Sequence, residues 1–208
     1  MSDNDKRFDR RSVLKAIGTT AVVGAGLGAS TGNVAAIETK QRLTEAYHDE
    51  MRLRTAFARH GAGLRANLVE EGFVSEDFEF ASVGVDLDAD VTGLEPSADD
   101  RLAGVTAVFE EGTATAFGML STSSDTHEIS LFVQPERDLA YAMAEPKDGG
   151  DRVIVTESDV TPTGCSYQSC GSCCTTDYKT LKTYDCDPDC TNCQLWDTEC
   201  SCKDEDAC

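Results

Sequence analysis

All ten cysteines of this 208-residue chain lie in its last 44 residues, from Cys165 to Cys208. This segment has few larger apolar side chains: Tyr167, Tyr178, Leu181, Tyr184, Leu195 and Trp196. A segment this short cannot bury enough apolar surface to offset its chain entropy, so covalent or metal cross-links must hold its fold. We therefore predict a small cysteine-rich module over residues 165–208, with little regular structure.

Five disulfides are the simplest cross-links for this module. They would use Cys165, Cys170, Cys173, Cys174, Cys186, Cys190, Cys193, Cys200, Cys202 and Cys208. The spacing does not select a pairing, because ten cysteines can pair in very many ways. Zinc is the alternative, since Cys170-x2-Cys173 and Cys190-x2-Cys193 have the spacing of a four-cysteine zinc ribbon. Disulfides suit an oxidising extracellular setting better, so we expect them and no cofactor.

The N-terminal sequence predicts an export signal. Residues Arg10, Arg11, Leu14 and Lys15 supply the paired arginines, the apolar residue and the trailing lysine of a twin-arginine signal. The weakly apolar stretch that follows, residues 16–29, is shorter than the ~20 residues that a membrane-spanning helix needs. We predict a signal peptide over residues 1–36, cleaved after Ala36 or alternatively near residue 29. The mature protein is then secreted by the twin-arginine route, with no stable membrane span.

The mature chain is strongly acidic. Residues 1–36 hold five basic and three acidic side chains, which leaves 13 basic and 35 acidic in residues 37–208, a net charge of −22. Such a surface repels nucleic acid and anionic membranes, so neither is an expected partner. The carboxylates are spread along the chain, as in proteins adapted to high salt, where ions screen their repulsion. Acidity combined with twin-arginine export resembles the secreted proteins of halophilic archaea.

Residues 37–158 predict one α+β domain. From Glu38 to about Arg59 apolar residues recur at steps of three and four, which indicates an amphipathic helix. Gly61 and Gly63 interrupt this pattern, and Glu71-Gly72-Phe73 has the form of a helix end with glycine in the left-handed conformation. A polar loop over residues 86–100 follows, which we expect to be exposed.

Beyond Arg101 the apolar period changes to two. Residues 105–109 and 113–117 predict two strands joined by a tight glycine turn, and residues 129–133, 139–143 and 152–155 predict three more. Short connections favour an antiparallel meander, with the N-terminal helices covering one face. The expected fold is thus N-terminal helices packed on a β-meander, followed by the disulfide-rich module.

The middle domain shows no catalytic constellation. His48, His60 and His127 stand apart from any motif that places a hydroxyl or carboxylate beside them, so we expect surface histidines. The run Asp86-x-Asp88-x-Asp90 opens like a calcium loop, but the glycine and glutamate that such a loop needs are absent. We therefore expect a solvated turn here, and a protein that is not an enzyme.

The junction between the domain and the module predicts a linker. Residues 159–164 are polar and contain Pro162 and Gly164, which suits an exposed, protease-accessible segment. Thr163 and Gly164 are the candidate processing site, and a cut between Ser158 and Gly164 would release the module as a peptide. A permanently attached module is the alternative.

This layout resembles the precursors of small haloarchaeal antimicrobial peptides, the microhalocins. The resemblance rests on the export signal, the cysteine-free middle domain and the cysteine-rich end that begins near Thr163-Gly164-Cys165-Ser166. It implies that the C-terminal peptide is a halocin and that the middle domain contacts it, in the same chain or in trans, to inhibit it or give immunity. Residues 165–208 hold nine acidic side chains against three lysines, so we expect a protein or cell-surface target. The alternative function is a permanently joined secreted binding protein with a disulfide- or zinc-stabilised module.

Overall fold

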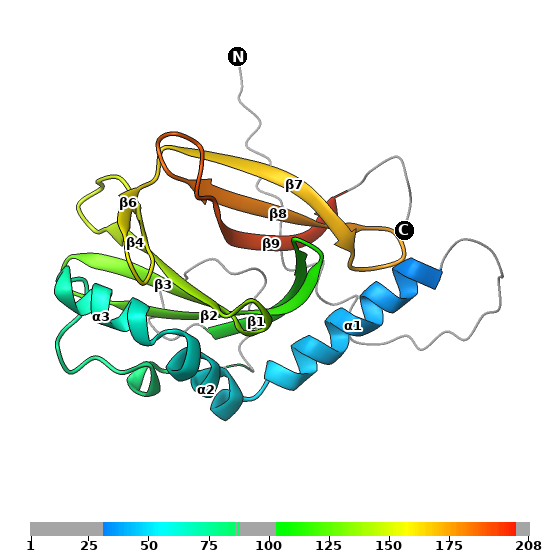
Figure 1. Cartoon of the computed structure of the whole chain (residues 1–208), viewed down its shortest axis with the longest axis horizontal. Coiled ribbons are helices and arrows are strands. Elements are labelled where there is room, and N and C mark those ends of the chain that lie inside the picture. Colours follow the sequence, from blue (N-terminus) through cyan, green and yellow to red (C-terminus); the bar gives the residue numbers. More distant parts are fainter. Residues whose placement is uncertain (1–30, 86, 88–102, 203–208) are drawn as a thin grey trace, which may run out of the picture.

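The computed structural model of the protein describes residues 31–85, 87 and 103–202. It confirms the α+β class (Figure 1). Helices pack on one face of a six-stranded antiparallel sheet, and a three-stranded sheet lies over the other face. The six-stranded sheet is therefore the middle of three layers.

Three helices precede the sheet: α1 (Thr31–Tyr47), α2 (Glu50–His60) and α3 (Ala62–Glu70). The prediction of a single helix from Glu38 to Arg59 is wrong, because helix α1 ends at Tyr47 and a second helix begins at Glu50. Asp49 caps α2 there, its side chain accepting a hydrogen bond from the Arg52 N–H at 2.9 Å. The predicted end of α3 is confirmed, with Gly72 in the left-handed conformation at φ 74°.

The central sheet is the predicted meander. Its strands are β1 (Ala103–Glu110), β2 (Thr113–Ser123), β3 (His127–Gln134), β4 (Leu139–Pro146), β5 (Val153–Val155) and β6 (Val160–Pro162). Each strand pairs antiparallel with the next one along the chain. Glu111 and Gly112 form the predicted tight turn, and both have positive φ, which matches the twist of a two-residue hairpin.

The junction is part of this sheet, which corrects the expectation of a free linker over residues 159–164. Strand β6 pairs with β5, with Val153 opposite Pro162. The Thr163 N–H donates to the Arg152 carbonyl at 2.8 Å, and the Gly164 N–H donates to the Cys186 carbonyl at 2.9 Å. These main-chain bonds continue the sheet across the junction, although Pro162 and Gly164 are exposed.

The cysteine-rich module has more regular structure than predicted. It forms a three-stranded antiparallel sheet of β7 (Cys165–Cys173), β8 (Lys179–Cys186) and β9 (Gln194–Cys202). Strand β8 lies in the centre, and Tyr167 on β7 pairs with Tyr184 on β8. The module is therefore a small sheet, with its described cysteines on the strands and in the connections between them.

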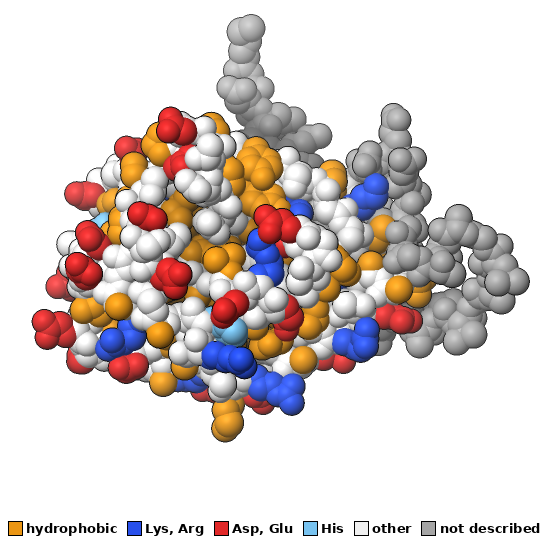
Figure 2. Space-filling model, viewed as in Figure 1, with side chains coloured by type: hydrophobic (Ala, Val, Ile, Leu, Met, Phe, Trp, Pro, Cys, Tyr) orange, Lys and Arg blue, Asp and Glu red, His pale blue; other side chains and the backbone are white. Residues whose placement is uncertain are grey.

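Both faces of the central sheet are buried. One face packs against α2 and α3 through residues such as Leu53, Phe57 and Leu131. The opposite face packs against the module through a second apolar cluster that includes Phe132 and Leu195. On the outside of the molecule, acidic side chains are scattered over the face shown in Figure 2 and do not gather in one patch.

Candidate functional site at the interface of the two sheets

The central sheet presents an apolar surface to the module, which we call the docking face. It consists of Val108, Phe117, Met119, Phe132, Tyr141, Met143 and Ile154. Three of its rings form a stacked column, with centroid distances of 5.4 Å between Phe117 and Phe132 and 5.2 Å between Phe132 and Tyr141. The module covers it with Tyr184, Leu195 and Trp196. Apolar contact between the layers is therefore continuous across several strands.

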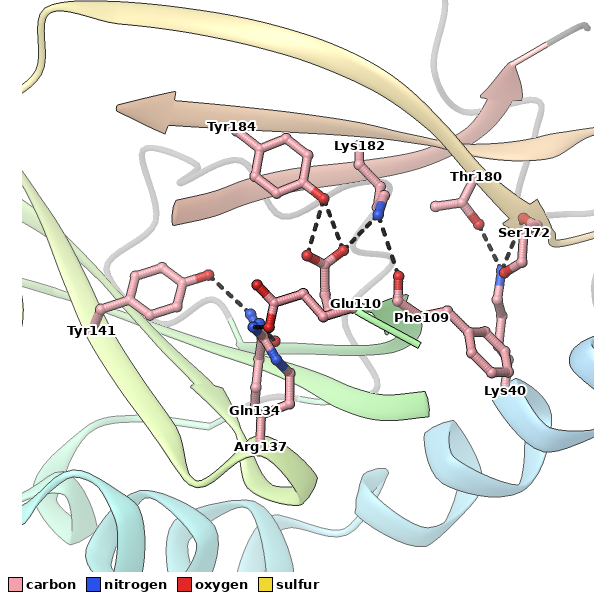
Figure 3. Close-up of polar contacts among 11 residues, drawn as sticks. Lys40, Phe109, Glu110, Gln134, Arg137, Tyr141, Ser172, Thr180, Lys182 and Tyr184 are labelled. Atoms are coloured by element: carbon pink, nitrogen blue, oxygen red, sulfur yellow. Dashed lines mark hydrogen bonds and ion pairs between the residues drawn. The ribbon is translucent and has the colours of Figure 1, made fainter. Parts of the chain in front are cut away.

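A buried carboxylate lies at the edge of the docking face (Figure 3). Glu110, the last residue of β1, is only 6% exposed. Its Oε1 atom accepts from the Lys182 amine at 2.7 Å, and the Tyr184 hydroxyl lies 2.8 Å and 3.0 Å from its two oxygens. The same amine also donates to the Phe109 carbonyl at 3.2 Å. Two donors from β8 thus converge on one carboxylate of the central sheet, and their contacts offset the cost of burying its charge.

The surroundings of Tyr184 keep its hydroxyl group protonated, so that it donates a hydrogen bond to Glu110. Burial, followed by its hydrogen bond and charge interaction with Glu110, raises the pKa of the Tyr184 phenol. The phenol therefore stays protonated near neutral pH. The Glu110 carboxylate can accept from it, as it does from the Lys182 ammonium.

A second polar contact crosses the centre of the apolar cluster. The hydroxyl of the fully buried Tyr141 donates to the Leu195 carbonyl of β9. The Gln134 side-chain amide donates to the same hydroxyl at 3.4 Å, and the Arg137 guanidinium donates to the Gln134 side-chain oxygen at 2.8 Å. Burial raises the pKa of Tyr141, so this phenol too remains a donor.

Arg152 joins the two layers at the rim. Its guanidinium donates to Asp185 of the module at 2.7 Å and to Glu145 of the central sheet at 3.1 Å. It also stacks on the Trp196 ring, with its central carbon 4.1 Å from the ring centroid. One planar cation therefore makes two ion pairs and a cation–π contact across the interface.

Helix α1 reaches the module through Lys40. Its amine donates to the carbonyls of Ser172 and Cys173, at 3.1 Å and 2.9 Å, and to the Thr180 hydroxyl at 2.8 Å. Lys40 is 7% exposed. Burial, with a smaller effect from the nearby charge of Lys182, lowers the pKa of Lys40 to about 8. The amine thus binds the ends of β7 and β8 from outside the sheet.

The predicted cysteines are disulfide-bonded wherever the structure describes them. The pairs are Cys165–Cys190, Cys170–Cys202, Cys174–Cys200 and Cys186–Cys193, and Cys173 is bridged as well. Cys208 lies outside the described residues. Such bridges form and persist in oxidising compartments, so they fit an extracellular protein.

The four cysteines with zinc-ribbon spacing are paired differently from a ribbon. Cys170, Cys190 and Cys193 are each bonded to a cysteine outside the proposed set of four, and Cys173 is disulfide-bonded as well. Over residues 31–85, 87 and 103–202, no group of three or more His, Cys, Asp or Glu side chains is arranged to hold a metal ion. No helix within the same ranges is long and apolar enough to cross a membrane.

The residues predicted for the export signal, the acidic turn, signal cleavage and processing are only partly described by the structure. Arg10, Arg11, Leu14 and Lys15 lie outside the described residues, as do Asp86, Asp88 and Asp90. The predicted cleavage residue Ala36 lies within α1, and Thr163 and Gly164 follow β6 directly.

The three histidines differ from one another. His48 is exposed, as expected. His60 instead has a side chain that is only 9% exposed, with Nδ1 2.6 Å from an Asp138 oxygen. His127 packs edge-on against Phe73, at 5.0 Å between ring centroids. His60 and His127 therefore have packing partners that the expectation of surface residues did not include.

Sequence reasoning missed the interface residues Lys40, Glu110, Tyr141, Lys182 and Tyr184. One signal for Glu110 was present, because it shares the strand face of Val108 at a spacing of two. No such signal existed for Lys40, whose acceptors lie more than 130 positions along the chain.

Comparisons with protein-family models, with curated proteins and with solved structures find no significant match to this chain.

Proposed function

We propose that this protein is a secreted, halocin-like precursor, exported by the twin-arginine route. Residues 165–208 are its antimicrobial peptide, and residues 37–158 hold that peptide inactive or protect the producing cell. One observation carries the proposal: the apolar side chains Tyr184, Leu195 and Trp196 of the module pack against the docking face. These side chains form the apolar surface with which the module could contact a target, and in the precursor the docking face covers that surface.

The construction of the module supports a separable peptide. Its cross-links stay within the module, since each of the four pairs named above joins two cysteines of residues 165–202. Bridges of this kind restrict the unfolded chain and stabilise a small fold, each by about 3 kcal/mol for loops of this size. We infer that the peptide keeps its three-stranded form after it leaves the docking face.

The contacts at the interface support binding as the role of the middle domain. They are apolar packing, hydrogen bonds and ion pairs between side chains of the two layers, as protein interfaces use them. We accordingly propose a protein that acts by binding and is not an enzyme. Its acidity supports a protein or cell-surface target and makes nucleic acid an unsuitable one.

Two measurements test this function. Intact-mass analysis of the culture supernatant should find a peptide that begins between Ser158 and Gly164 and is lighter by ten hydrogens than the reduced chain. That peptide should inhibit the growth of related strains, and an equimolar amount of the domain spanning residues 37–158 should abolish the inhibition. Inactivity of the oxidised peptide against all tested strains would remove the antimicrobial role.

The second candidate is a secreted binding protein whose module stays attached. The junction favours it, because β6 and the main-chain bonds of Thr163 and Gly164 tie the module to the central sheet. A protease that cuts at Gly164 must first detach this edge of the sheet. The supernatant analysis separates the two candidates, since a permanently joined protein appears only at the mass of residues 37–208.

A further inference from the structure

We propose that Lys182 and Tyr184 form a carboxylate-binding site on the module, and that Glu110 fills this site while the module is docked. After release, the site takes a carboxylate of an acidic peptide segment on the target of the module. The use by a target rests on the function proposed above, whereas occupation by Glu110 is a property of the intact chain.

The geometry of the donors favours a carboxylate. An ammonium and a phenol hydroxyl, both from β8, approach the same carboxylate within 2.7–3.0 Å. A carboxylate can accept from both donors and neutralises the ammonium charge, which a neutral ligand cannot do. The pair therefore matches a single negative group in charge and in hydrogen-bonding capacity (Figure 3).

The donors are positioned within the module itself. The Tyr184 ring stacks on Tyr167 of β7, with centroids 4.8 Å apart and an interplanar angle of 11°. The Lys182 amine lies 5.5 Å from the centroid of the Tyr184 ring. These contacts use only β7 and β8. The Cys170–Cys202 cross-link ties β7 to β9, and β8 pairs with both strands between them. The stack of the two tyrosine rings lies wholly within the module, so we expect a released module to keep Tyr184 and Lys182 side by side on β8.

The second acceptor of Lys182 points to a peptide ligand. The amine donates to the Phe109 carbonyl as well as to the Glu110 carboxylate, so it binds a main-chain oxygen and the acidic side chain of the next residue. A peptide segment supplies both acceptors at this spacing. Glu110 and its preceding carbonyl thus occupy the position that an acidic segment of the target takes after release.

The test removes the internal carboxylate from the full-length protein and offers a free one. Glu110→Ala leaves the two donors facing a cavity of carboxylate size. We expect the variant to melt about 10 °C below the wild type in chloride, since it leaves a buried ammonium without its partner. Replacing about 1 M chloride by formate or acetate at constant ionic strength should recover roughly 3 to 5 °C beyond any change in the wild type.

Controls make the result specific. Glu111→Ala removes the neighbouring carboxylate, whose side chain is 82% exposed, and should respond to formate as the wild type does. Adding Tyr184→Phe to Glu110→Ala should reduce the recovery, and acetamide should produce none. If Glu110→Ala does not fold in chloride, the yield of folded protein in formate against chloride is the readout.

The result that overturns the site is an equal response of Glu110→Ala and Glu111→Ala to formate. Failure of the proposed function has a different signature. An inactive peptide in the growth assay with carboxylate recovery intact leaves the site in place and removes only its use by a target.

Discussion

The Tyr141 hydroxyl donates to the main-chain carbonyl of Leu195, joining the middle of the central sheet to strand β9 of the module. Tyr141 has no exposed surface, and Leu195 is 2% exposed. The bond crosses the apolar cluster between the two sheets, where water cannot replace it. The two layers therefore meet through a specific polar contact as well as apolar packing.

Removing this hydroxyl should destabilise the protein. Tyr141→Phe keeps the ring and its stacking on Phe132 but leaves the Leu195 carbonyl without this donor. We expect a loss of about 1–3 kcal/mol in the free energy of unfolding, the cost of an unsatisfied buried group. Denaturant unfolding measures the loss. Tyr167→Phe, at a ring 48% exposed, is the matched control and should change stability by less than about 0.5 kcal/mol.

The buried amine of Lys40 should make stability depend on pH. Its pKa in the folded protein is about 8, below the ordinary lysine value of 10.5, so between these values the unfolded state binds more protons. Stability gains from Lys40 as pH rises through this window. Above pH of about 10 the raised pKa values of Tyr141 and Tyr184 oppose this gain, because the unfolded phenols ionise first.

Denaturation midpoints measured from pH 7 to 10 test this dependence. The difference between the wild type and Lys40→Met isolates the contribution of the amine, because both proteins contain the same tyrosines. We expect the wild type to gain stability relative to the variant between pH of about 8 and 10. Parallel curves for the two proteins would show that Lys40 keeps an ordinary pKa and is not held as described.

Arg152 should be sensitive to a conservative change. Arg152→Lys keeps the charge but loses the planar group that stacks on Trp196 and binds Asp185 and Glu145 together. We expect a loss of about 1 kcal/mol and a red shift in the emission of Trp196, the single tryptophan. Arg137→Lys, at an arginine that binds Gln134 and Glu111, should leave the emission unchanged. Identical spectra for both variants would contradict the stacking.

Disulfide mapping tests the cross-links of the module. A non-reducing digest should yield peptides joined through Cys165–Cys190, Cys170–Cys202, Cys174–Cys200 and Cys186–Cys193. Thiol labelling of the native protein should find no reactive cysteine, with or without a chelator. Four thiols that become reactive when zinc is chelated would support the ribbon spacing of Cys170, Cys173, Cys190 and Cys193 instead.

Local sequence patterns predicted the helices and the meander because these elements depend on neighbouring residues. The Glu111-Gly112 turn and the Gly72 helix end follow from backbone preferences at single positions. The sequence of β4 held a further signal, because residues 139–144 are apolar at every position. Such a run is typical of a strand buried on both faces, and it would have indicated a layer on each side of the sheet.

The interface itself could not be predicted in this way. Nothing in the sequence of α1 distinguishes Lys40 from the other charged residues of this helix, and only the folded chain brings it to Thr180. Lys182 and Tyr184 alternate on β8, which indicates a shared face but not the carboxylate that this face meets. Proline and glycine near the junction predicted a loop, whereas pairing with β5 made a short edge strand. Long-range packing decided each of these positions.

The central claim, that the middle domain holds the module by noncovalent contacts at the docking face and the β5–β6 edge, is tested by cutting the full-length chain. Residues 157–159 form an exposed turn between β5 and β6, so a protease site can be inserted there. After cleavage at high salt, the two fragments should elute together from a size-exclusion column and separate only in denaturant. Elution as two separate fragments under native conditions would contradict the claim.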